Sequence, residues 1–389
     1  MSSSLVQPPE LPLDEMTALR RSLHMEPEMS GEERVTATIL ENYLNLYPPD
    51  QLMSHLGGYG LAAIYQGAQT GPTVLIRADM DALPIHELND VMYRSTREGL
   101  AHTCGHDGHM AIVGGLAPLL HSHRPRRGRA VLLFQPAEET GAGAQAVLND
   151  PRFESLDPDY CFAIHNLPGF ALGEVLVAPQ IFAAASVGLM VEFSGLTAHA
   201  AYPETGCSPA RAMADLIQGL QALNPATPPA QTRDFSLVTV VSASLGEASF
   251  GISPGAANIM ATLRAFDDSV LTALKTKALA LAESLAARDG LRCHLRWEDA
   301  FPATHNNPEA SQWIRQAAEA AGYRVSDLDE PLRWSEDFGW FTRRCQGAMF
   351  GLGAGPDLAL HNPRYDFPED LLAPGVTIFW RLLQRLLYE

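Results

Sequence analysis

The stretch TVLIRADMD (residues 73–81) indicates the fold class, because a short run of branched apolar residues ends directly in two aspartates. Three later stretches have a similar form: AVLLFQPAEE (130–139), YCFAIH (160–165) and AMFGLG (348–353), with His361 a few residues beyond the last. Each apolar run has the length of a buried strand, and helical spacing separates several of them. Strands that alternate with helices predict an α/β domain with a mostly parallel sheet and helices on both faces.

The middle of the chain has a different order of elements. We expect four strands and two helices there, in the order strand, helix, strand, strand, helix, strand, at 187–195, 208–223, 236–246, 258–266, 269–290 and 291–299. This is the order of a ferredoxin-like α+β domain. We therefore predict a discontinuous α/β domain (1–182 and 300–389) that is interrupted by an inserted domain at 183–299.

The N-terminal part shows helical apolar spacing over residues 14–46, interrupted by HMEPEMSGEE. Ser30 and Glu33 in this interruption fit a capping box at the start of a second helix.

Composition excludes several classes of protein. The formal charge of -18 makes general binding of nucleic acid unfavourable, because most encounters with phosphate backbones would be repulsive. No apolar run is long enough to cross a bilayer, and the stretch MSSSLVQPPELPLDEM has no basic segment followed by an apolar one. The 5 cysteines are odd in number and widely spaced, so no disulfide framework is expected. We predict a cytoplasmic protein with no nucleic-acid or membrane partner.

Side chains of the types that bind metal ions in proteins follow the predicted strands. They are Asp79, Asp81, Glu138, Glu139, His165 and His361. Ligands of an open α/β sheet bind outside the carboxyl ends of its strands, so these groups are expected at one rim. The motif HTCGHD (102–107) adds the thiol of Cys104 and the imidazole of His106, with Gly105 allowing a tight turn. Alone the motif also fits a loop with a core cysteine, but the combined set predicts a metal site.

The adjacent acids Glu138 and Glu139 fit two roles in such a site. One carboxylate can bind metal, and the other can take a proton from a water and return it to a leaving amine. In the alternative, both are acids favoured by the dipole at a helix start, which does not explain their setting after a buried strand. The full set of ligands can hold two ions about 3.5–4 Å apart, the arrangement of many metallohydrolases.

Seven segments that span nearly the whole chain belong together: RADMDALPI (77–85), AHTCGHDGHM (101–110), FQPAEE (134–139), AIHN (163–166), GLTAHAAYPETG (195–206), WSEDFG (334–339) and HNPRYDF (361–367). They resemble, in family order, segments of the dimetal peptidase superfamily that contains aminoacylase and glutamate carboxypeptidase. Within it, the chain is most similar to the amidohydrolase group of hippurate-hydrolase-like and auxin-conjugate-hydrolase-like enzymes.

The resemblance implies two divalent metal ions per subunit, with Zn²⁺, Mn²⁺, Co²⁺ or Ni²⁺ as candidates. The implied ligands are Cys104, His106, Glu139, His165 and His361, with Cys104 bridging. Glu138 would be the general base and then the general acid. Asp81 would orient a ligand from behind. The roles of Asp79, Glu336 and Asp337 stay open.

The resemblance also implies that the inserted domain is a lid that closes over substrate and joins two subunits in a homodimer. His199 would then stabilise the oxyanion in the partner's site, and Arg264 would bind a substrate carboxylate. In the alternative, both are exposed residues at strand ends. The chain departs from the family pattern at Gly251, which stands where the family usually has an asparagine.

These observations predict metal-dependent hydrolysis of the amide bond in N-acyl amino acids. A carboxypeptidase or dipeptidase of the same superfamily needs the same carboxylate clamp and is the alternative, with a short peptide as substrate. A non-catalytic binding homologue is disfavoured, because no ligand or base is missing. The glycine pattern at 141–143 is a weak signal for a dinucleotide, because it does not directly follow a strand.

Overall fold

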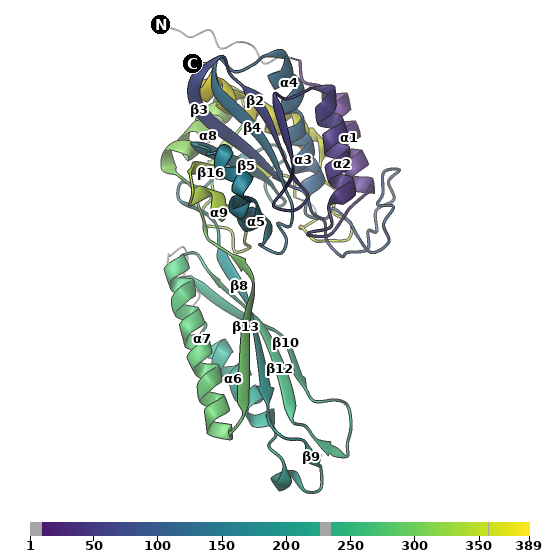
Figure 1. Ribbon diagram of the computed structural model, residues 1–389, viewed down its shortest axis with the longest axis vertical. Coiled ribbons are helices and arrows are strands. Elements are labelled where there is room, and N and C mark those ends of the chain that lie inside the picture. Colours follow the sequence, from purple (N-terminus) through teal and green to yellow (C-terminus); the bar gives the residue numbers. More distant parts are fainter. Residues whose placement is uncertain (1–9, 226–234, 357) are drawn as a thin grey trace. The chain divides into compact units, whose positions relative to one another are not determined.

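The computed structural model describes residues 10–225, 235–356 and 358–389, and the chain divides into two compact units; Figure 1 labels many of their helices and strands. The first unit comprises Met1–Phe182, Thr304–Leu328 and Asp337–Glu389, and the second comprises Ala183–Ala303 and Asp329–Glu336. In the part of the chain that the structure describes, no helix combines the length and the apolar character needed to span a bilayer.

The second unit is larger than the predicted insertion at 183–299. Its last strand continues to Phe301, past the predicted end. A separate segment also joins it, because the backbone N–H of Ala184 donates to the carbonyl oxygen of Leu332 over 2.9 Å. Sequence patterns miss such a return of the chain, since it depends on contacts between distant residues.

The first unit is built on an eight-stranded sheet. In spatial order its strands are β1 (Gln51–Leu56), β2 (Gly60–Gln66), β4 (Arg127–Gln135), β3 (Gln69–Asp79), β5 (Tyr160–Leu167), β16 (Gln346–Gly353), β6 (Val175–Val177) and β15 (Val325–Asp327). The central strands β4, β3, β5 and β16 are parallel, as are β6 and β15. The pairs β1–β2, β2–β4 and β16–β6 are antiparallel. The predicted mostly parallel sheet is confirmed.

Helices cover both faces of this sheet. On β3, Val74 and Ile76 belong to the main core cluster, which six helices share: α1 (Leu13–Met25), α2 (Arg34–Leu46), α3 (His106–Gly114), α4 (Leu116–Ser122), α8 (Pro308–Ala320) and α10 (Leu372–Leu387). Arg77 points to the opposite face, because side chains alternate along a strand. There it donates to Asp337, which also accepts from the backbone N–H of Ala144. The short helices α5 (Gly143–Asn149) and α9 (Gly339–Thr342) therefore lie on that face.

The second unit has the predicted order of strands and helices. Its main elements are β8 (Ala185–Ser194), α6 (Ala210–Ala222), β10 (Ser236–Leu245), β12 (Ala256–Ala265), α7 (Asp268–Asp289) and β13 (Arg292–Phe301). The sheet is antiparallel in the order β10, β12, β8, β13, and the two helices pack on it through a separate apolar core. Gly290, with a φ of 66°, ends α7.

The remaining elements are short. They are β7 (Ile181–Ala183), β9 (Ala198–His199), β11 (Ile252–Ser253), β14 (Thr304–His305), and the 3-10 turns η1 (Pro151–Ser155), η2 (Pro203–Thr205) and η3 (Glu369–Leu371).

Candidate metal centre

The centre lies where parallel strands end and α3 begins. Cys104 and His106 flank Gly105, whose φ of 91° belongs to the left-handed region. A Cβ atom on Gly105 would also lie 2.6 Å from Oδ1 of Asn166, which follows His165 on β5. Glycine is therefore required here for both backbone conformation and space, and it brings the thiol and the imidazole to the end of β5.

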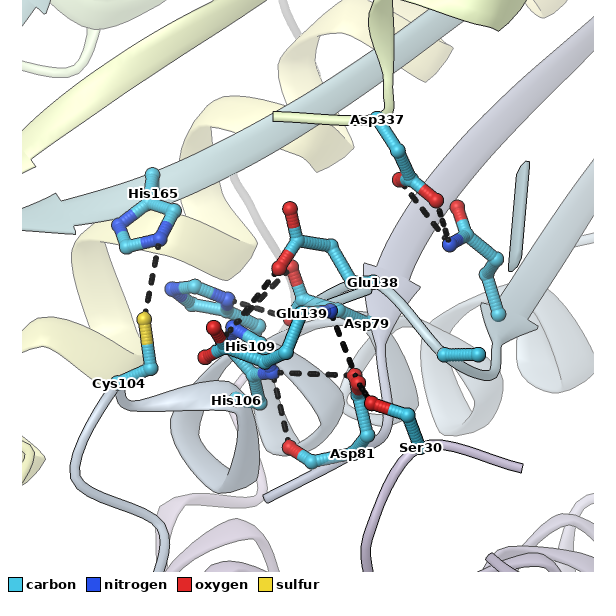
Figure 2. A network of polar contacts seen from close by, with 12 residues as sticks. Ser30, Asp79, Asp81, Cys104, His106, His109, Glu138, Glu139, His165 and Asp337 are labelled. Carbon is cyan, nitrogen blue, oxygen red and sulfur yellow. Dashed lines mark hydrogen bonds and ion pairs between the residues drawn. The ribbon is translucent and has the colours of Figure 1, made fainter. Parts of the chain in front are cut away.

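The structure brings all five predicted ligands together in the first unit (Figure 2 labels four of them). Cys104 Sγ lies 3.7 Å from His165 Nε2. Glu139 Oε1 lies 3.8 Å from His106 Nε2 and 3.7 Å from His361 Nε2. Cys104 belongs to two groups of candidate ligand atoms, one with His106 and His165 and one with Glu139 and His361. The ligand atoms of each group lie within 4.8 Å of one another.

Hydrogen bonds leave the lone pairs of two imidazoles directed into this cluster. His106 Nδ1 lies 2.9 Å from the carbonyl oxygen of Asp81, and His165 Nδ1 lies 2.8 Å from that of Asn166. A carbonyl oxygen only accepts, so each Nδ1 carries the proton and each Nε2 can bind a cation. Nε2 of His106 and Oε1 of Glu139 are buried without a hydrogen-bond partner. Buried polar atoms of this kind fit a cation site.

Burial also shifts the pKa of the clustered groups. It raises the pKa of the Cys104 thiol, and it raises the pKa of Glu139 to about 7. Burial, together with the neighbouring His109, lowers the pKa of His165. A bound cation would favour the thiolate, the carboxylate and the neutral imidazole, which are the forms that bind metal.

Asp81 contacts two of the candidate ligands, His106 and Glu139. Its Oδ2 accepts hydrogen bonds from the backbone N–H of Glu139 over 2.9 Å and from Ser30 Oγ over 2.6 Å, and its backbone carbonyl orients His106. Glu138 is buried next to the cluster of candidate ligands, with its Oε2 4.0 Å from His106 Nε2 (Figure 2). The carboxylate of Glu138 thus faces the side of the cluster formed by His106 and Glu139.

Asp79 and Asp337, whose roles the sequence left open, are held by buried hydrogen bonds and ion pairs near the centre. Asp79 lies 2.7 Å from both Arg77 and His109, and Asp337 accepts from Arg77 and Gln135. These contacts make Asp79 and Asp337 members of a buried ionic network.

His109 was missed by sequence reasoning, although it joins Asp79 to Asn166. The signal was present: His106 and His109 are three residues apart on α3, and such residues share one face of a helix.

His199 and Arg264 belong to the second unit. His199 is exposed at the end of β9, where its Nδ1 accepts from the backbone N–H of Ala201. Arg264 lies on β12 and donates to the Arg333 carbonyl and to Ser335 Oγ, each over 3.1 Å. The backbone carbonyl of Gly251 accepts from the N–H of Ala200, next to His199. A side chain at Gly251 would meet no neighbour within 4 Å, so a steric need does not explain the glycine.

The sequence of the chain matches the description Peptidase family M20/M25/M40 over residues 75–385. The chain belongs to this family. It is 31% identical to an N-acetyl-L-cysteine deacetylase of Bacillus subtilis, over 96% of this chain and 88% of the relative. It is 29% identical to a hippurate hydrolase of Campylobacter jejuni, over 96% of this chain and 97% of the relative.

A solved M20 structure has the same fold. This dinuclear metal-binding peptidase of the M20 family from Bacillus subtilis aligns with a TM-score of 0.80 and 26% identity, covering 97% of this chain and 98% of that one. The chain is thus an M20 hydrolase that acts on amide bonds.

Proposed function

We propose that this M20 hydrolase cleaves the amide bond of N-acyl amino acids with two divalent cations. The observation that carries the proposal is the convergence of five side chains of the types that bind metal ions. Two of them, His106 and Glu139, have a buried atom without a hydrogen-bond partner. The residues that would hold the cations are Cys104, His106, Glu139, His165 and His361. As the family resemblance implies, Cys104 would serve both cations; it shares one group of candidate ligand atoms with His106 and His165 and another with Glu139 and His361. When bound, the cations polarise the amide carbonyl and acidify a water.

Glu138 is the proposed general base. Its carboxylate is buried, with Oε2 4.0 Å from His106 Nε2, and it is not needed as a ligand in the proposed set. It would hold the proton taken from that water and deliver it to the leaving nitrogen. Asp81 would keep His106 and Glu139 in place through its backbone and carboxylate contacts.

The proposed substrate follows from the relatives, which are named for removing acyl groups from cysteine and for hydrolysing hippurate. We assign Arg264 to the substrate carboxylate and His199 to the oxyanion, as the family resemblance implies. We also propose a homodimer formed through the second unit, which sedimentation analysis tests. A carboxypeptidase or dipeptidase action remains the second candidate, because both would use the same clamp.

We place the enzyme in the cytoplasm. All five cysteines have free thiols, which fits a reducing compartment. Cell fractionation tests this location. The metal in the cell is Zn²⁺, Mn²⁺, Co²⁺ or Ni²⁺, and metal analysis of protein from its native cell distinguishes them.

The test combines metal analysis with a panel of N-acetyl amino acids, hippurate and dipeptides. Chelation should abolish turnover, and added divalent metal should restore it. Glu138→Gln should retain the metal content of the wild type and lose about 100-fold or more in kcat. Glu98→Gln, an exposed control, should retain both. Full turnover by metal-free protein, or by Glu138→Gln, would refute the mechanism.

A further inference from the structure

The loop between α1 and α2 contacts the turn that carries Glu138 and Glu139. This turn follows β4 and begins with Ala137, which has a φ of 54°. Residues other than glycine rarely adopt this left-handed conformation, and they do so where surrounding contacts hold them. The directions in which the Glu138 and Glu139 side chains point therefore depend on the contacts that stabilise the backbone of Ala137.

Glu33 supplies one such contact. Its Oε1 accepts hydrogen bonds from the backbone N–H of Ala137 and from that of Gly31, each over 2.8 Å. Glu33 is fully buried, although it was expected to cap α2. That cap is instead provided by Glu28, whose Oε2 accepts from the N–H groups of Val35 and Thr36. The predicted capping box is therefore wrong, and Glu33 bonds to the turn rather than to the helix start.

Ser30 is linked to the same turn through Asp81. Its hydroxyl donates to Asp81 Oδ2, and the same oxygen accepts from the backbone N–H of Glu139 (Figure 2). Ser30 thereby holds the Asp81 carboxylate in the orientation that receives Glu139. The two contacts lie on either side of Glu138: Glu33 bonds to the residue before it, and Ser30 acts through Asp81 on the residue after it.

We infer that Ser30 and Glu33 are positioning residues, which hold the turn so that Glu138 and Glu139 face the metal centre. Neither touches the reacting atoms. Their effect passes through Ala137 and Asp81, by the kind of support that orients metal ligands from behind. The inference rests on the proposed function for its effect on turnover, but its effect on metal affinity does not depend on the substrate.

The test measures Zn²⁺ affinity by competition with a chromophoric chelator, and kcat and KM on the best substrate of the panel. Glu33→Ala should lower metal affinity and kcat by about 10- to 100-fold, with a much smaller change in KM. Glu33→Gln keeps an acceptor oxygen and should retain most of both. Ser30→Ala removes a single hydroxyl and should lower metal affinity and kcat, as Glu33→Ala does. This variant keeps the test available if Glu33→Ala does not fold.

Two comparisons separate positioning from general stability. Glu28→Ala also deletes a buried carboxylate of this loop that accepts two backbone N–H groups, so it should lower the thermal midpoint and leave metal affinity and kcat unchanged. Adding Ala137→Gly to Glu33→Ala should restore much of the metal affinity and of kcat, because glycine adopts a positive φ without support from a neighbouring side chain.

The inference is overturned if Glu33→Ala and Ser30→Ala bind Zn²⁺ as tightly as Glu28→Ala does. It is also overturned if Ala137→Gly gives no recovery in Glu33→Ala. A wild-type protein that binds metal but hydrolyses nothing on the panel would count against the proposed function instead, and the affinity comparison would still decide the role of the loop.

Discussion

A buried histidine of α1 should make the stability of this protein fall between neutral and alkaline pH. His24 Nδ1 lies 2.8 Å from Asp107 Oδ2, and His24 Nε2 lies 3.1 Å from Glu87 Oε1. Burial and the nearby Arg20 oppose a charge on His24, but the hydrogen bonds to the two carboxylates outweigh them and raise its pKa to about 9. In the folded protein, His24 is therefore charged at neutral pH.

The size of the effect follows from the shift in pKa. The ordinary pKa is 6.5 and the folded value is about 9, and each unit is worth about 1.4 kcal/mol, so the charged imidazole adds up to about 3 kcal/mol to the free energy of unfolding. Because the folded pKa exceeds the unfolded one, this contribution is complete below pH 6.5. It is lost progressively as the pH rises through about 9.

Urea denaturation of the metal-saturated protein at a series of pH values across this window tests the effect. His24→Gln should show a weaker fall in unfolding free energy than the wild type, with the difference approaching about 3 kcal/mol over the window. His121→Gln, which alters an exposed histidine, should follow the wild type. Equal losses in the wild type and in His24→Gln would refute the reasoning, because the charge on His24 would then contribute nothing.

Three further substitutions test other parts of the structure. Arg77→Met leaves Asp79 and Asp337 without their buried cation and should lower the unfolding free energy by about 3–5 kcal/mol in urea titrations; a change below about 1 kcal/mol would contradict the ion-pair assignment. Gly105→Ala places a methyl group 2.6 Å from Asn166 and should reduce the metal content of dialysed protein; an unchanged stoichiometry would show that the turn tolerates a side chain. Arg264→Ala should raise KM for N-acyl amino acids at least about tenfold, with no effect on amide substrates that lack the carboxylate. Equal changes for both substrate types would remove Arg264 from that role.

The sequence by itself predicted the α/β class and a metal site at one rim of the sheet, and the family resemblance selected the five ligands from the candidate side chains. Strand-length apolar runs end just before Asp79 and His165, and parallel strands bring their carboxyl ends to one edge. The motif around Gly105 could be placed at a helix start from its glycine and the apolar spacing that follows. These are local patterns, and the topology of a parallel sheet converts them into proximity.

The tertiary structure alone decided how that cluster is supported. Ser30 and Glu33 match a local capping pattern, but their partners lie 51 and 104 residues away in the sequence. Arg77 likewise could not be assigned without knowing that Asp337 approaches it, and the spacing that puts His109 on the same helix face as His106 does not identify Asn166 as its partner. A buried polar side chain takes the hydrogen-bond partner that packing brings to it, and packing between distant segments leaves no periodic signal in the sequence.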